Sequence, residues 1–134
     1  MQIVSVVVER PIEACWRAFT DPRAAIAWVP GLREALVIED GPGGLPREVQ
    51  FELTGNLLYS LIYTYDAVAR VVRWEPRVGK TGAVRGFARF DDVDGATRFT
   101  YALEHEPGRK AFERAIDNPR LLVDAFARFM HERG

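Results

Sequence analysis

The chain has 134 residues, which is enough for one domain with a hydrophobic core and too few for two. Apolar residues make up 48% of it, which excludes a disordered chain, and the net charge of −1 argues against bulk attraction to nucleic acid or anionic lipid. The single cysteine, Cys15, excludes an intrachain disulfide. The first residues lack the basic start of a signal peptide, and no apolar run is long enough for a membrane span, so we expect a cytoplasmic protein.

One strand and two short helices are predicted at the start of the chain. Residues 2–9 (QIVSVVVE) are rich in β-branched side chains, which favour a strand, and Pro11 ends it. The next apolar residues follow the spacing i, i+3, i+4 and i+7, which predicts one face of a helix: Ile12, Cys15, Trp16 and Phe19. Asp21-Pro22 is a typical helix start, and it predicts a second, short helix that ends before Pro30-Gly31.

From Arg33 the apolar residues alternate, and we predict six strands, at about 33–40, 47–54, 57–68, 70–76, 82–92 and 97–106. The segments between them are too short for crossover helices, so the sheet should be antiparallel. Asn118-Pro119 then begins a last helix, whose apolar stripe we expect to face the concave side of the sheet. That stripe consists of Leu122, Ala125, Phe126 and Phe129, with Leu121 and Met130 beside it.

Two segments, VERPIEACWRAFTDP (8–22) and AWVPGL (27–32), resemble the START/Bet v 1-like superfamily, also called SRPBCC and including polyketide cyclase/dehydrase-like proteins. The resemblance implies one α+β domain over residues 1–134 with the helix-grip fold. In that fold a curved seven-stranded antiparallel sheet wraps around a C-terminal helix, and two short helices lie between strands 1 and 2. Most members bind hydrophobic ligands between sheet and helix, some are cyclases or hydrolases, and others bind proteins. Pro119 departs from the pattern, because it interrupts a terminal helix that is often longer.

Alternation along the strands predicts which side chains face the cavity. Several aromatic hydroxyls fall among apolar residues on the predicted concave face, a mixture typical of a pocket for an apolar ligand with a few polar groups. A tyrosine on a sheet is also a common core or rim residue, so the cluster argues more strongly than any one member. The candidate ligand-binding residues are Trp28, Phe51, Tyr59, Tyr63, Tyr65, Trp74, Tyr101, Leu103, Phe126 and Met130. Trp28 is expected at the entrance.

The strand at 82–92 permits two orientations. One places its small and apolar residues inward, and the other places Arg85 and Arg89 in the pocket, where they could bind a carboxylate or a phosphate. We favour the first, because unpaired buried arginines are costly. The outer face would then carry a row of arginines among acidic residues: Arg73, Arg85, Arg89 and Arg98.

Catalytic signals are sparse, and no metal-binding or phosphate-loop spacing is present, so we expect no cofactor and no metal. His105 is the candidate general base, with Tyr101 on the same predicted face. The leading hypothesis is binding of a small hydrophobic molecule such as a lipid, an isoprenoid or a polyketide-like compound. One alternative is a cyclase or dehydratase that uses His105 with Tyr101 or Tyr63. Another is a protein-interaction module that uses the outer arginines. RNA would bind at the same face, but the net charge argues against nucleic acid as a partner. We expect a monomer or a homodimer.

Overall fold

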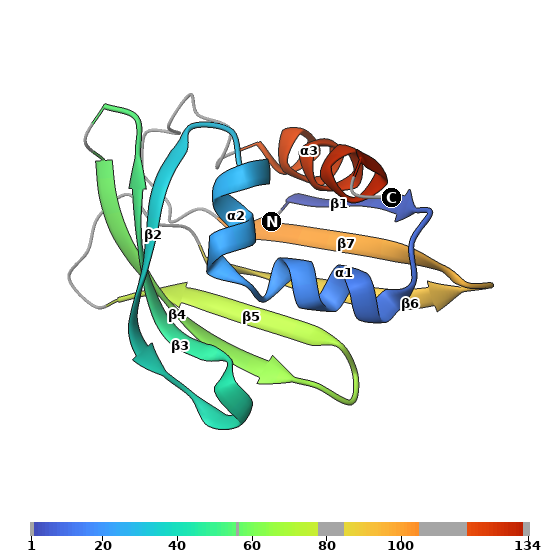
Figure 1. The fold of residues 1–134 in the computed structure, drawn as a ribbon, viewed down its shortest axis with the longest axis horizontal. Helices are drawn as coiled ribbons and strands as arrows, with labels where there is room; N and C mark the ends of the chain where they lie inside the picture. Colours follow the sequence, from blue (N-terminus) through green and yellow to red (C-terminus); the bar gives the residue numbers. More distant parts are fainter. Residues whose placement is uncertain (1, 56, 78–84, 105–117, 133–134) are drawn as a thin grey trace.

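One curved antiparallel sheet forms the frame of the molecule (Figure 1). The computed structural model describes residues 2–55, 57–77, 85–104 and 118–132. Within these ranges the sheet has seven strands in the order β1-β7-β6-β5-β4-β3-β2. The strands are β1 (Gln2–Val8), β2 (Leu32–Asp40), β3 (Pro46–Leu53), β4 (Leu57–Asp66), β5 (Val71–Pro76), β6 (Arg85–Val93) and β7 (Ala96–Glu104). Every neighbouring pair is antiparallel, and β1 pairs with the last strand, β7, which confirms the predicted helix-grip fold class.

In the described ranges, three α-helices pack on the concave face, and they cover it unevenly. Helix α1 (Ile12–Phe19) lies on β6 and β7, and α3 (Pro119–Glu132) lies along β1 and β7 (Figure 1). Helix α2 (Pro22–Trp28) packs between α3 and β2, which is the strand at the other edge of the sheet. The helices therefore pack mainly on the β1–β7–β6 side and on the far edge, and the middle strands β3 to β5 curve away beneath α2.

Local side-chain hydrogen bonds set several element boundaries. Asp21 caps α2 by accepting a hydrogen bond from the Arg23 backbone N–H at 3.0 Å, as its position before a proline predicts. Asn118 caps α3 by accepting from the Leu121 backbone N–H at 3.2 Å. Strand β4 ends at Asp66, two residues earlier than predicted, because the Asp66 carboxylate accepts hydrogen bonds from the backbone N–H groups of Val68 and Ala69 and folds the chain into a turn.

The buried face of α3 is broader than the predicted stripe. Leu122 and Phe126 are buried as expected, whereas Ala125 and Phe129 are only partly buried. The residues that complete the buried face are Val123, Ala127 and Met130. The helix contacts β1 and β7 as well as α2, so two flanks of it are covered instead of one.

Strand β6 has the orientation that we favoured. Ala88 and Phe90 are buried, and Arg85 and Arg89 are exposed on the outer face. Arg89 contacts Asp91 at 3.0 Å, so part of the arginine row is paired within its own strand. Val84, which belongs to the same alternation, lies outside the described residues.

Candidate ligand-binding site

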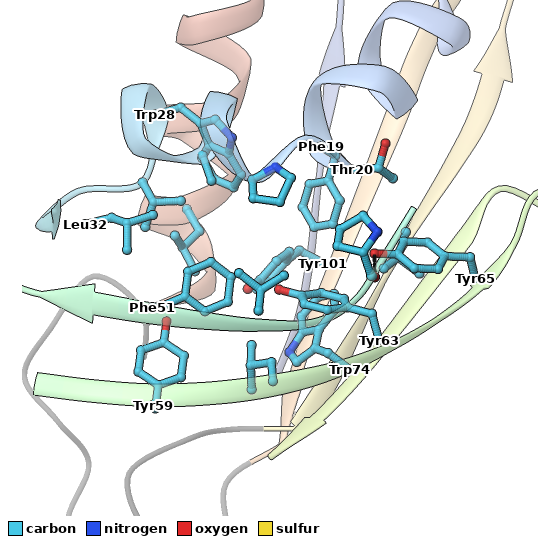
Figure 2. Close-up of a pocket in the computed structure, with 18 residues that line it drawn as sticks. Phe19, Thr20, Trp28, Leu32, Phe51, Tyr59, Tyr63, Tyr65, Trp74 and Tyr101 are labelled. Carbon is cyan, nitrogen blue, oxygen red and sulfur yellow. Dashed lines mark hydrogen bonds between the residues drawn. The ribbon is translucent and has the colours of Figure 1, made fainter. Parts of the chain in front are cut away.

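A cavity lies between the middle strands of the sheet and the junction of α1 and α2 (Figure 2). Its volume is about 80 Å³. Ordinary small-molecule pockets begin at about 300 Å³, so this conformation has room for a fragment or a few water molecules. The lining residues are Phe19, Thr20, Pro22, Ala25, Trp28, Val29, Leu32, Pro46, Val49, Phe51, Tyr59, Leu61, Tyr63, Tyr65, Val72, Trp74, Tyr101 and Leu122.

Seven of the residues proposed from the sequence lie together in this lining: Trp28, Phe51, Tyr59, Tyr63, Tyr65, Trp74 and Tyr101. Three others, Leu103, Phe126 and Met130, do not line the cavity and lie in the packed core at no more than 1% exposure. Phe126 and Met130 belong to α3 and Leu103 to β7, and they lie where the helix and the sheet are in direct contact. His105 lies outside the described residues.

Sequence reasoning missed the lining residues that belong to no regular face. Thr20 lies between α1 and α2, Pro22 begins α2, and Pro46 begins β3. Alternation and helical periodicity identify faces inside an element, so they give no information about a residue at its end. The available signal was the Thr20-Asp21-Pro22 break, which shows that the chain turns there but not what it turns over.

Phe19 separates the cavity from the packed core. It lines the cavity, and its ring contacts Trp28 at 6.0 Å and Trp74 at 6.1 Å between centroids. On its other side it meets Phe99 at 5.5 Å and Phe126 at 5.9 Å. The end of α1 therefore closes the cavity toward β7 with an aromatic wall.

Trp74 forms the floor of the cavity because β6 has a glycine beside it. A β-carbon at Gly86 would lie 2.9 Å from Cζ2 of the Trp74 indole and would also clash with the Ala102 carbonyl oxygen. The indole packs against Tyr101, with 5.2 Å between ring centroids. The small residue in β6 thus makes space for a large aromatic side chain from β5.

The cavity contains several tyrosine hydroxyls, and those of Tyr63 and Tyr65 differ in their partners. Tyr65 donates a hydrogen bond to the Pro46 carbonyl oxygen at 2.6 Å, so its proton is already in use. The Tyr63 hydroxyl has no hydrogen-bond partner among the described residues. Burial raises the pKa of both phenols, that of Tyr63 well above its usual value, and Tyr59, Tyr65 and Tyr101 beside Tyr63 raise its pKa further. Both phenols are therefore neutral at physiological pH.

Charged groups are kept out of the cavity. None of its lining residues is charged, and the ion pairs of the described part of the chain are formed by other residues. Trp28 is 8% exposed, and its indole Nε1 is buried without a hydrogen-bond partner in the described ranges.

The described residues contain no group of three or more His, Cys, Asp or Glu side chains placed to hold a metal ion. Within the same ranges, no helix has the length and apolar character needed to cross a membrane.

Comparison with solved structures gives the same fold over almost the whole chain. A START superfamily protein from Mycobacterium smegmatis matches with a TM-score of 0.78 at 11% identity, covering 99% of this chain and 98% of that one. An aromatase/cyclase from a Streptomyces species matches with a TM-score of 0.71 at 16% identity, covering 98% and 93%. A di-domain aromatase/cyclase from the steffimycin biosynthetic pathway matches with a TM-score of 0.73 at 14% identity, covering 99% of this chain and 46% of that one.

The chain therefore has the START-like helix-grip fold, as its first 32 residues suggested. A scan of protein-family models and a search of curated proteins gave no match.

Proposed function

We propose that the protein binds a small hydrophobic molecule, of lipid, isoprenoid or polyketide-like type, in the cavity between the sheet and the helices. The observation that supports this most directly is the lining, which is aromatic and aliphatic, contains a few hydroxyls and includes no charged side chain. Such a surface gains free energy when an apolar ligand displaces water from it.

Binding of a ligand of ordinary size requires the cavity to widen from about 80 Å³. Helix α2 is the part of the wall best suited to move, because it has only seven residues and is joined to α1 through the two residues Thr20 and Asp21. Its last residue, Trp28, packs edge-on against Phe126 with 5.0 Å between ring centroids. In this proposal Trp28 breaks that contact as α2 moves outward, and its ring then contacts the ligand.

Two neighbouring residues of β4 provide a test with a built-in control. Leu61 lines the cavity, whereas Ile62 faces the outer side of the sheet. We expect Leu61→Trp to fill the cavity and to weaken binding of the neutral fluorophore N-phenyl-1-naphthylamine at least tenfold, and Ile62→Trp to leave binding unchanged.

Native mass spectrometry of the protein purified without added ligand complements the titration. A bound apolar molecule in the wild type that is lost from Leu61→Trp supports the proposal. Absence of both a bound mass and saturable fluorophore binding in the wild type would show that the cavity has no such function.

A cyclase or dehydratase is the second candidate, and the two aromatase/cyclases among the structural matches favour it. His105 would remove a proton from the substrate, and Tyr63 or Tyr101 would donate a hydrogen bond to the enolate oxygen that forms. The raised pKa of Tyr63 suits a hydrogen-bond donor that keeps its proton. A poly-β-ketone surrogate that the wild type converts and His105→Ala does not would support this activity; equal conversion by both proteins would exclude the role of His105.

A further inference from the structure

We infer that the cavity disfavours anionic ligands and selects ligands whose buried part carries an uncharged hydrogen-bond acceptor, such as a carbonyl or ether oxygen, and that Tyr63 is the residue that recognises it. This inference rests on the proposed function, since it specifies the kind of apolar ligand. Two observations support it: the distribution of charge around the cavity, and the difference between the Tyr63 and Tyr65 hydroxyls.

The lining offers nothing to balance the charge of an anion. A carboxylate or phosphate that enters the cavity loses its water, and this is costly unless a cation or several hydrogen bonds replace the water. The arginines of β6, which could have paired with an anion, are exposed on the outer face of the sheet. The cavity therefore disfavours anionic ligands.

Tyr63 is the phenol whose proton is available to a ligand. Tyr65 lies beside it in a stacked arrangement, with 6.0 Å between ring centroids, but donates to the Pro46 carbonyl. On the other side the Tyr63 ring contacts Trp74 at 6.2 Å, so its orientation is fixed by aromatic neighbours. Figure 2 shows the Tyr63 hydroxyl pointing into the cavity, and it has no hydrogen-bond partner among the described residues.

A hydroxyl in this position weakens the binding of a pure hydrocarbon ligand. Water can accept its proton while the cavity is empty, but a ligand that displaces that water must supply an acceptor or leave the donor unpaired. Because the phenol stays protonated well above its usual range, it acts as a donor throughout the physiological pH range. The ligand group that satisfies it is an acceptor without charge.

Three probes of nearly equal size and branching separate these effects: acetophenone, isopropylbenzene and benzoate. Binding is followed at pH 7.5 through the indole N–H signals of the protein in ¹H–¹⁵N spectra. Trp28 and Trp74 line the cavity, whereas Trp16 does not and serves as the internal reference. We expect acetophenone to bind at least fivefold more tightly than isopropylbenzene and at least tenfold more tightly than benzoate.

Two variants assign the selectivity to one hydroxyl. Tyr63→Phe should weaken acetophenone binding about five- to tenfold, the effect of one neutral hydrogen bond, and leave isopropylbenzene binding equal or tighter. Tyr65→Phe removes a hydroxyl with a partner inside the protein, so it should preserve the preference for acetophenone.

The possible failures are distinguishable. If isopropylbenzene and acetophenone bind equally and Tyr63→Phe changes neither, or if benzoate binds as tightly as acetophenone, the inference is wrong while the proposed function stands. If no probe shifts the Trp28 and Trp74 signals, both are wrong.

Discussion

Substitution of Phe126 by alanine tests whether α3 is held on the sheet by the aromatic cluster. Phe126 is fully buried, and its ring lies 4.7 Å from Phe99 and 5.0 Å from Trp28 between centroids. Burial of a phenylalanine side chain contributes about 1.5–3 kcal/mol, and each close aromatic pair adds about 0.5–1.5 kcal/mol. Together with the cavity left behind, these contributions predict a loss of about 4 kcal/mol in the free energy of unfolding, within the range of about 3–5 kcal/mol for such substitutions.

Urea unfolding followed by circular dichroism measures this loss. With an m-value of about 2 kcal/mol/M, the midpoint should fall by about 2 M. A domain of ordinary stability, about 5–15 kcal/mol, stays folded after such a loss, so the transition is observable.

Leu121 provides the matched control on the same helix. It is 50% exposed, so Leu121→Ala should change the free energy of unfolding by less than about 0.5 kcal/mol. If Phe126→Ala costs less than about 1.5 kcal/mol, or if Leu121→Ala costs as much as Phe126→Ala, then α3 does not pack on the sheet as described.

Two further predictions concern the ionisable groups of the core. Burial raises the pKa of Tyr63 and Tyr65 above 10.0, so above about pH 10 the unfolded chain releases protons that the folded protein keeps. The free energy of unfolding should therefore be insensitive to these groups at neutral pH and fall as the pH rises above about 10. In urea titrations between pH 8 and 11 the fall should be smaller in Tyr63→Phe, and an equal fall in variant and wild type would contradict the reasoning. Cys15 is fully buried and burial raises its pKa, so Ellman's reagent at pH 8 should modify it only as fast as the protein unfolds; rapid labelling of the native protein would show that this part of the core is open.

Much of the fold could be predicted from the sequence, because its signals are local. The spacing of Cys15, Trp16 and Phe19 follows from 3.6 residues per helical turn, and the alternation of Tyr59, Leu61 and Tyr63 follows from the two-residue period of a strand. These periods do not depend on distant contacts, so they assign faces correctly in a chain met for the first time. They also placed the aromatic residues of β4 and β5 on the face that lines the cavity.

The sequence did not predict which residues at the ends of elements line the cavity, or which faces of a helix are buried. Thr20, Pro22 and Pro46 line the cavity from positions where no period applies. The buried face of α3 gained Val123 and Ala127 because the helix contacts α2 as well as the sheet, which its own apolar stripe does not reveal.

By itself the sequence determined the elements, their order and the inward set of aromatic side chains. Only the tertiary structure decided which of those side chains line the cavity and which pack in the core. Helix α3 packs against β1 and β7, so Leu103 and Phe126 are enclosed, while the curvature of β3 to β5 leaves Tyr63 beside a cavity. The same placement brings Pro46 to Tyr65 and leaves Tyr63 without a partner in the described residues, because a hydrogen bond between distant segments depends on where the sheet brings them together.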